Sequence, residues 1–257
     1  TISLLQSFKP TIEFEDLTYN FVTDFEKFLY ESGYQTNTVA KHMKHLKSFV
    51  NAAINKGYID PNNYAFRRYK IKMKEGKHVF LLPEEMKKLE EVSLTGRNSC
   101  LEHTLDAFLF CCYTGLRYSD FVNLNEKNIV KMDGKLWLIF DSVKTGTEVK
   151  LPLNLLFEGK ALTLLQKYQG KWSSFFSIKN NSSVNKELIR IGKLAKISKH
   201  FSFHSARHTN ATLLIYKGAN ITTVQKLLGH KNLATTQIYG EVMGSTIIRD
   251  LKKCQKR

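Results

Sequence analysis

The sequence predicts a mainly α-helical protein with a small antiparallel β-sheet, organised as two domains that meet near residue 78. Three observations carry this prediction. Apolar residues recur at intervals of three and four in segments on both sides of residue 78, which is typical of amphipathic helices. Two turn signals, Asp133-Gly134 and the stretch KTGT, separate short apolar runs and predict a small sheet. A basic stretch with little periodicity, residues 66–80, lies between the two helical regions.

The first domain, residues 1–78, is predicted to contain two amphipathic helices. One follows Thr18, a good N-cap residue, and ends at Gly33, and the other begins near Asn37 and ends at Gly57. The polar side of the second helix carries three lysines, Lys41, Lys44 and Lys47. A solvated helix face and a nucleic-acid contact surface each explain these lysines when they are considered alone.

The basic stretch that follows favours nucleic acid, and we interpret it as a linker between the domains. It contains six cationic side chains, Arg67, Arg68, Lys70, Lys72, Lys74 and Lys77. Residues 1–78 hold 12 basic and 8 acidic residues, and residues 79–257 hold 27 and 15, so the formal charges are +4 and +12. Because both domains are basic, we expect a clamp that contacts one DNA duplex from two sides.

The second domain, residues 79–257, is predicted to begin with a helix at Pro83, because acidic residues follow in the first turn and lysines later. An apolar helix then ends at Gly115, and Arg117 follows just beyond that end. An arginine there is also explained as a cap for helix carbonyls. Two strands flank the turn that carries Lys144, a position at which solvent-exposed lysines are common.

The composition narrows the class of protein. The chain has 257 residues with 42% hydrophobic content, enough for one large core or two modest ones, and a formal charge of +16 that favours a polyanionic partner such as nucleic acid. No apolar run approaches the roughly 20 residues of a spanning helix, and no signal peptide opens the chain. We therefore expect a soluble cytosolic protein. Because the chain starts at Thr1 rather than Met, we expect a fragment that lacks an N-terminal segment.

Cysteine spacing predicts reduced thiols. There is no CxxC pattern, so neither disulfides nor a zinc site is indicated. The four cysteines are Cys100, Cys111, Cys112 and Cys254.

The last third of the chain carries the most informative residues. His204, Arg207 and His208 are spaced i, i+3 and i+4 and therefore share one helical face. Zinc binding by the two histidines is disfavoured, because Arg207 would oppose a cation and no HExxH glutamate is present. An anion suits this face better. A further helix leads to His230, and Tyr239 follows nine residues later.

Together these residues predict phosphoryl transfer to a tyrosine. Two guanidiniums, those of Arg117 and Arg207, can stabilise the extra negative charge of a pentacoordinate phosphate. A tyrosine has a reference pKa near 10, so Tyr239 needs a base to accept its proton, for which His204 is our choice. Lys144 is assigned as the acid that protonates the leaving 5′ oxygen. His230 is assigned as a hydrogen-bond donor to a phosphate oxygen. This scheme requires neither a metal nor a cofactor.

At this point the motifs carry a family resemblance. Four motifs over residues 114–239 resemble, in their order, the signature of tyrosine recombinases of the phage integrase family. They are TGLRYSD, VKTGTEVKLPL, HSARHTNA and LLGHKNLATTQIYG. The resemblance implies a helical core-binding domain with a basic linker over residues 1–78, and a mixed α/β catalytic domain over residues 79–257. It also implies that Tyr239 forms a 3′-phosphotyrosyl bond and that five residues surround the scissile phosphate: Arg117, Lys144, His204, Arg207 and His230.

Two positions depart from the family pattern without removing a catalytic group. Ala206 stands where the family often has leucine, and Gly240 stands where histidine is common. The stretch FEDLTYNFVTDFEKFLYESG is most similar to integrases of Bacteroides-type mobile elements. The implied reaction is thus the integration or excision of a mobile genetic element.

The resemblance also implies partners. These are double-stranded DNA, a homotetramer on two duplexes during synapsis and an accessory DNA-bending protein, with no membrane and no cofactor. We expect the segment after Tyr239 to dock on a neighbouring protomer, although a helix packed on its own domain is an equal alternative for Ile247, Ile248 and Leu251. Deleting residues 244–257 should then abolish synapsis and leave single-site DNA binding. Two other functions remain open at this stage, a DNA-binding regulator without the chemistry and a type IB topoisomerase.

Overall fold

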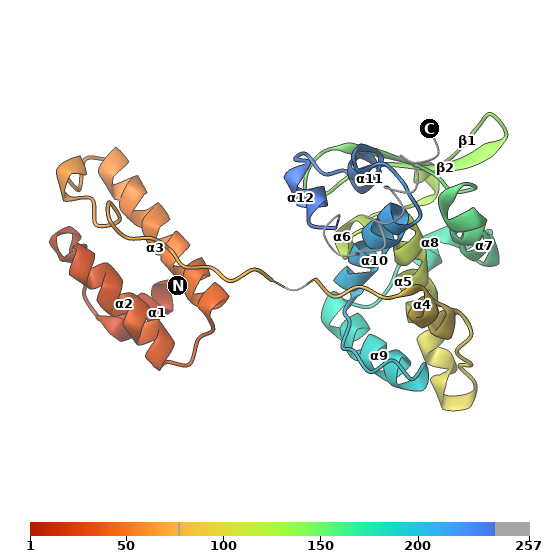
Figure 1. Cartoon of the computed structure of the whole chain (residues 1–257), viewed down its shortest axis with the longest axis horizontal. Coiled ribbons are helices and arrows are strands. Elements are labelled where there is room, and N and C mark those ends of the chain that lie inside the picture. Colours follow the sequence, from red (N-terminus) through yellow and green to blue (C-terminus); the bar gives the residue numbers. More distant parts are fainter. Residues whose placement is uncertain (77, 240–257) are drawn as a thin grey trace, which may run out of the picture. The chain divides into compact units, whose positions relative to one another are not determined.

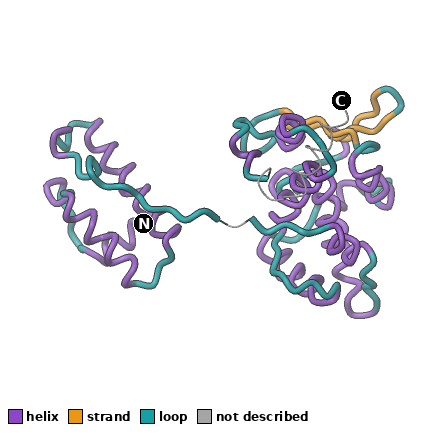
Figure 2. Tube along the Cα trace, in the orientation of Figure 1, coloured by secondary structure: helices purple, strands orange, loops and turns teal. Residues whose placement is uncertain are grey.

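The computed structural model of the chain describes residues 1–76 and 78–239. The chain divides into two compact units, Thr1–Lys77 and His78–Arg257, which we call unit 1 and unit 2 and describe separately. The predicted fold class, mainly helical with one small antiparallel sheet, is confirmed (Figure 1, Figure 2). Some predictions concern positions outside the described residues and stay predictions. These positions are Gly240 and residues 244–257, which include Cys254.

Over residues 1–76, unit 1 contains three α-helices, α1 (Ile2–Phe8), α2 (Tyr19–Glu31) and α3 (Thr36–Asn55). As predicted, Thr18 caps α2, because its hydroxyl oxygen accepts a hydrogen bond from a backbone N–H three residues later at 3.3 Å. Helices α2 and α3 lie side by side (Figure 1) and bury their apolar stripes against each other. Fully buried members of this core are Phe25, Leu29, Met43 and Val50. Helix α1, which the sequence did not predict, packs the ring of Phe8 against α2.

Unit 2 surrounds one large core and holds the remaining helices of the described chain. They are α4 (Pro83–Glu90), α5 (Glu102–Thr114), α6 (Tyr118–Phe121), α7 (Lys160–Lys167), α8 (Trp172–Phe176), α9 (Asn181–Leu194), α10 (Phe203–Tyr216), α11 (Ile221–Leu228) and α12 (Ala234–Gln237). Over residues 1–76 and 78–239, none of the helices combines the length and the apolar character that crossing a bilayer requires.

Three of these helices, α7, α8 and α9, occupy residues 160–194, to which the sequence analysis assigned no element. The reason is clearest for α8, which has only five residues, far fewer than an isolated helix needs in water. Its stability comes from burial of Phe175 and Phe176, whose rings pack on Phe110 of α5 at centroid distances of 5.4 and 6.2 Å. Tertiary packing therefore determines this helix.

The sheet consists of β1 (Ile129–Met132), β2 (Lys135–Asp141) and β3 (Glu148–Pro152), in the order β1-β2-β3 with both pairs antiparallel. It lies at one edge of unit 2 (Figure 2). The predicted turn between β1 and β2 is present, and both of its residues, Asp133 and Gly134, have positive φ. The register pairs Ile129 with Leu138 and Phe140 with Val149.

Helix α5 runs through the middle of unit 2 and packs closely against α10 (Figure 1). Every residue from 104 to 114 is buried, and the helix ends at Gly115, as predicted, in a left-handed conformation with φ +75°. A Cβ at Gly115 would lie 2.6 Å from a side-chain carbon of Leu228 and 2.8 Å from the side-chain oxygen of Asn210. This close approach fixes the end of α5 against α10 and α11.

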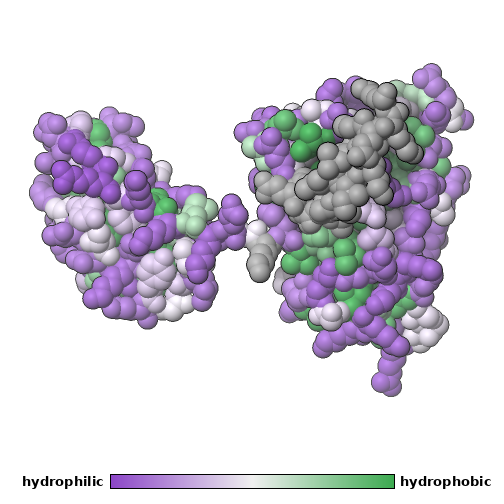
Figure 3. All heavy atoms as spheres, in the orientation of Figure 1, coloured by the Kyte–Doolittle hydropathy of each residue, from purple (hydrophilic) through white to green (hydrophobic). Residues whose placement is uncertain are grey.

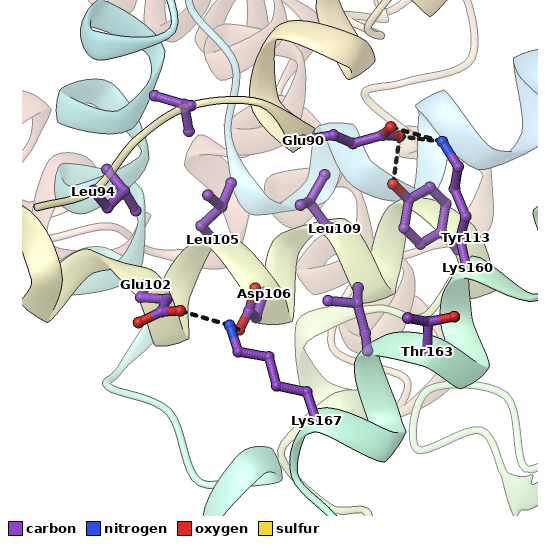
Figure 4. Close-up of a pocket in the computed structure, with 12 residues that line it drawn as sticks. Glu90, Leu94, Glu102, Leu105, Asp106, Leu109, Tyr113, Lys160, Thr163 and Lys167 are labelled. Atoms are coloured by element: carbon purple, nitrogen blue, oxygen red, sulfur yellow. Dashed lines mark hydrogen bonds and ion pairs between the residues drawn. The ribbon is translucent and has the colours of Figure 1, made fainter.

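A hollow of about 390 Å³ lies between α5, α7 and residues 90–94 (Figure 4). Two lysines of α7 bridge it to carboxylates: Lys167 lies 2.7 Å from Asp106, and Lys160 lies 2.6 Å from Glu90. Glu90 also accepts a hydrogen bond of 2.6 Å from the Tyr113 hydroxyl. The first ion pair holds α7 against α5, and the second holds α7 against the end of α4. The residues that line the hollow include none of the predicted site residues.

Candidate active site

Arg117 follows the tight end of α5 and occupies the N-cap position of α6. Its guanidinium donates a hydrogen bond of 2.9 Å to the Ser142 hydroxyl and lies 3.4 Å from the carboxylate of Asp120. Asp120 is buried and also accepts the backbone N–H of Val143 at 2.9 Å. The sequence alternative, in which Arg117 caps helix carbonyls, is thus replaced by a side-chain network that joins α6 to the end of β2.

Lys144 lies in the loop between β2 and β3, as its turn signal predicted. The loop is closed by two backbone hydrogen bonds that Ser142 makes, one with Thr147 at 2.9 Å and one with Gly146 at 2.7 Å. The Lys144 side chain is exposed. A flexible four-carbon stem on an exposed loop leaves its ammonium free to reach a bound anion.

Arg207 lies on α10 and is buried, with 3% of its surface exposed. Its two terminal nitrogens donate to backbone carbonyls, one to Gly115 at 2.8 Å and the other to Leu228 at 2.5 Å. Burial, and secondarily the charge of Arg117, lower the pKa of Arg207 to about 9. The guanidinium therefore stays charged at neutral pH and joins the ends of α5 and α11 to α10.

His230 follows α11, which ends at Gly229 in a left-handed conformation with φ +62°. One ring nitrogen of His230, Nδ1, lies 2.9 Å from the Thr236 hydroxyl, and the His230 carbonyl accepts a hydrogen bond from Gln225. Burial is the largest cause that lowers the pKa of His230 to about 4, followed by the charge of Arg207. The imidazole is therefore neutral at pH 7.

Tyr239 combines a core ring with a bonded hydroxyl. Its ring is buried among apolar residues, Ala211, Ile215, Val224 and Leu228. Its hydroxyl lies 2.9 Å from Nδ1 of His208. Burial raises the pKa of Tyr239, while the charges of Arg207 and Arg117 act in the opposite direction. The ring of Tyr239 thus packs in the core, while its hydroxyl makes a hydrogen bond.

Mutual electrostatic effects place the six predicted residues in one cluster. The pKa of His204 is lowered by partial burial and then by the charges of Arg207, Arg117 and Lys144, and the same three cations lower that of His230. Such effects weaken with distance, because salt screens exposed charges beyond about 10 Å. Tyr239 joins the cluster through its coupling to both arginines.

Sequence reasoning missed three contributors, His208, Asp120 and Ser142. The Tyr239 hydroxyl is bonded to His208 and not to His204, which the sequence analysis chose as the base. His208 was visible on the same helical face, which the sequence assigns to an anion, but it was given no role in the chemistry. Among the described residues, no group of three or more His, Cys, Asp or Glu side chains is arranged to hold a metal ion.

Comparison with protein families decides the identity. The model of the phage integrase family matches residues 79–244, and that of the phage integrase SAM-like domain matches residues 1–72. The chain belongs to the phage integrase family. Members of this family cut and rejoin DNA.

Similar proteins include tyrosine recombinases from several bacteria. This integrase-family chain is 30% identical to the tyrosine recombinase XerC of Oceanobacillus iheyensis over 241 residues, which cover 88% of the chain and 77% of XerC. It is also 30% identical to a tyrosine recombinase of Pseudothermotoga lettingae over 237 residues, covering 90% and 80%. The finer resemblance to integrases of Bacteroides-type elements stays a prediction.

Solved structures share the fold of this integrase-family chain. A lambda integrase fragment, solved as a dimer bound to a core site, has a TM-score of 0.77 at 19% identity and covers 95% of this chain and 86% of that one. The integrase of transposon Tn1549, in complex with transposon right-end DNA, has a TM-score of 0.72 at 17% identity and covers 97% and 89%.

In unit 1 of this family member, the predicted DNA-binding residues lie at the surface. Six of them are exposed: Lys41, Lys44, Arg67, Arg68, Lys70 and Lys72. Lys47 is half-buried, with its ammonium 6.0 Å from the centre of the Phe66 ring. The end of the basic stretch returns to the start of α3, because Asn37 makes two hydrogen bonds of 2.9 Å with the backbone of Lys74. Hydrophilic residues cover most of the face of unit 1 that is seen in Figure 3.

Proposed function

We propose that the chain is a site-specific recombinase of a mobile genetic element, with Tyr239 as its nucleophile and no cofactor. One observation carries the assignment of the nucleophile: the Tyr239 hydroxyl lies in a cluster whose other members are cationic or imidazole groups, including two arginines that act on its pKa. A cluster of positive charge around one phenol suits a reaction in which the phenol attacks a phosphodiester.

The proposed step transfers a phosphoryl group between oxygens. The Tyr239 oxygen attacks phosphorus, the bond from phosphorus to the 5′ oxygen breaks, and a 3′-phosphotyrosyl bond forms. Arg117 and Arg207 stabilise the added negative charge of the pentacoordinate transition state. Rejoining is the reverse reaction, with a 5′ hydroxyl from the exchanged strand as the nucleophile.

Proton transfers balance the step. The phenol proton passes to His204, and Lys144 on its exposed loop protonates the departing 5′ oxygen, while His230 donates to a phosphate oxygen. His204 suits the role of base because its lowered pKa keeps it neutral at pH 7. The exposure of both His204 and Lys144 supports their access to a phosphate in solution.

The proposed partner is duplex DNA, held as a clamp by the core-binding domain with its basic linker, residues 1–78, and the catalytic domain, residues 79–257. A lambda integrase tetramer has been solved on a Holliday junction, with a TM-score of 0.72 to this chain. By analogy we propose a homotetramer on two duplexes, with an accessory DNA-bending protein, at the nucleoid in the bacterial cytoplasm. A regulator without the chemistry would form no covalent adduct, and a type IB topoisomerase would relax supercoils without exchanging strands.

A nicked suicide substrate tests the nucleophile. The wild-type chain should form a covalent adduct at the 3′ side of the break and leave a free 5′ hydroxyl, with EDTA present. Tyr239→Phe should bind the same DNA and form no adduct. Tyr168→Phe is the matched control, because it also loses a hydrogen-bonded phenol hydroxyl, here 2.7 Å from Asp106 and away from the cluster. An adduct that persists in Tyr239→Phe removes this residue from the mechanism.

A further inference from the structure

His78, the first residue of unit 2, contacts the predicted nucleophile and the histidine that binds it. Its ring centre lies 4.7 Å from that of His208, with the planes inclined at 44°, and 6.3 Å from that of Tyr239, at 53°. On α10, His204 packs edge-on against His208 at 4.6 Å. The His208 imidazole is therefore enclosed between two other imidazoles.

The bond between His208 and Tyr239 joins two neutral groups. The pKa of His208 is lowered to about 3, mainly by burial and then by the neighbouring His204, His78, Arg207 and His230. The pKa of Tyr239 is raised above its ordinary value of 10 by burial. The proton therefore stays on the phenol oxygen, His208 stays neutral, and a hydrogen bond joins the hydroxyl to Nδ1. In this state His208 binds the hydroxyl without deprotonating it.

This bond and the burial of the ring keep the hydroxyl away from the solvent-facing part of the cluster. Tyr239 is 5% exposed, whereas Lys144 and His204, which would meet the phosphate, are exposed. A phenol whose hydrogen bond is already satisfied must give up that bond before its oxygen can attack phosphorus. Release of the hydroxyl from His208 is thus a step that precedes the chemistry.

We propose that His78, His208 and Tyr239 form a latch, in which the chain segment entering unit 2 covers the histidine that holds the nucleophile at rest. The name latch denotes these three residues. His78 and His208 are positioning residues, because they act on the reaction only through Tyr239. This inference rests on the proposed role of Tyr239.

The position of His78 in the chain gives the latch a route to respond to DNA. His78 follows the basic stretch, whose exposed Arg67, Arg68, Lys70 and Lys72 are predicted to contact phosphates. A displacement of that stretch by DNA acts on His78 through a few peptide bonds. Once His78 moves, His208 gains water, its imidazole loses one covering ring, and its hold on the hydroxyl weakens.

Fluorine NMR on the DNA-free full-length chain tests the latch directly. 3-Fluorotyrosine in place of Tyr239 gives one signal that reports the environment of the hydroxyl. We expect His78→Ala and His208→Leu to move this signal towards that of free 3-fluorotyrosine. His78→Phe keeps the covering ring, and His208→Asn keeps an acceptor near the position of Nδ1, so both should restore most of the wild-type shift. His200→Ala, at an exposed position outside the latch, is the control.

The second measurement is the rate of adduct formation on the nicked suicide substrate. It uses each of these substitutions in the chain without fluorotyrosine. His78→Ala and His208→Leu should form the adduct faster than wild type by about fivefold, the factor that one ordinary hydrogen bond represents. An unchanged fluorine signal in both variants overturns the latch, and so does slower adduct formation in both. If the wild type forms no adduct at all, the proposed function fails, while the fluorine signal still decides whether the latch exists.

Discussion

The hydroxyl of Thr145 donates a hydrogen bond of 3.3 Å to the backbone carbonyl of Gly229. It thereby ties the loop that bears Lys144 to the turn that precedes His230. A Cβ added at Gly229 would lie 2.7 Å from a methyl carbon of Val149 in β3, so the two segments also pack without space for another atom. The sheet and the end of α11 thus position two proposed catalytic side chains relative to each other.

Thr145→Val should slow adduct formation on the suicide substrate by about fivefold and change the free energy of unfolding by no more than about 1 kcal/mol, the range of one hydrogen bond. The reason is that valine keeps the shape of threonine and removes only the bond to the turn. Thr163→Val is the matched control, since it removes a hydroxyl that donates over the same 3.3 Å to the backbone carbonyl of Gly159, the residue before α7. Equal rates for the two variants would show that this tie has no part in positioning Lys144.

Asp120→Asn should reduce adduct formation by at least tenfold and lower the free energy of unfolding by about 1 to 3 kcal/mol. The neutral amide loses the charge that faces Arg117, and its NH2 group cannot accept the hydrogen bonds that the carboxylate accepts. The control is Asp106→Asn, which alters another buried carboxylate, paired with Lys167 in the hollow of Figure 4. It should destabilise the chain and leave the rate at saturating protein unchanged. A similar rate loss in both variants would indicate a general loss of folded protein.

Acid should destabilise unit 2 from about pH 6.5 downward. His208 and His230 have pKa values of about 3 and 4 in the folded state, below the 6.5 of an unfolded histidine. Between these values the unfolded chain binds more protons, so stability falls as pH falls, with a slope of up to about 1.4 kcal/mol per pH unit for each histidine. Urea unfolding at pH 7.5 and pH 5.0 measures this slope.

His208→Asn should remove part of that pH dependence, because asparagine does not titrate. His200→Asn, at an exposed position, should leave it as in wild type. If the His208→Asn chain lost as much stability between pH 7.5 and pH 5.0 as the wild-type chain, the low pKa of His208 would be contradicted.

DNA binding should require both units. Residues 79–257 alone should bind a single recombination site more weakly than the full chain, and the dependence of affinity on salt should become shallower because fewer phosphate contacts release counterions. Replacing Lys41, Lys44 and Arg68 by alanine in the full chain should shift both quantities in the same direction. Equal affinity of the fragment and the full chain, at one salt concentration, would contradict the clamp.

The sequence by itself determined the elements that carry strong local signals. Thr18 and Gly115 mark a helix start and a helix end because their capping chemistry depends on neighbouring backbone groups alone. The Asp133-Gly134 turn likewise needs only its own dihedral angles. The family motifs also identified the six predicted site residues, since their order and spacing are readable without coordinates.

Tertiary structure decided what those side chains contact. Whether Tyr239 meets His204 or His208 depends on how the segment after α11 crosses α10, and no local pattern encodes that crossing. Helix α8 is likewise too short to form without the aromatic core that covers it. Burial then lowers the pKa of His208 and raises that of Tyr239, because desolvation depends on all surrounding atoms and not on neighbours in sequence. Residue types and their order are thus properties of the chain, whereas partners and protonation states are properties of its packing.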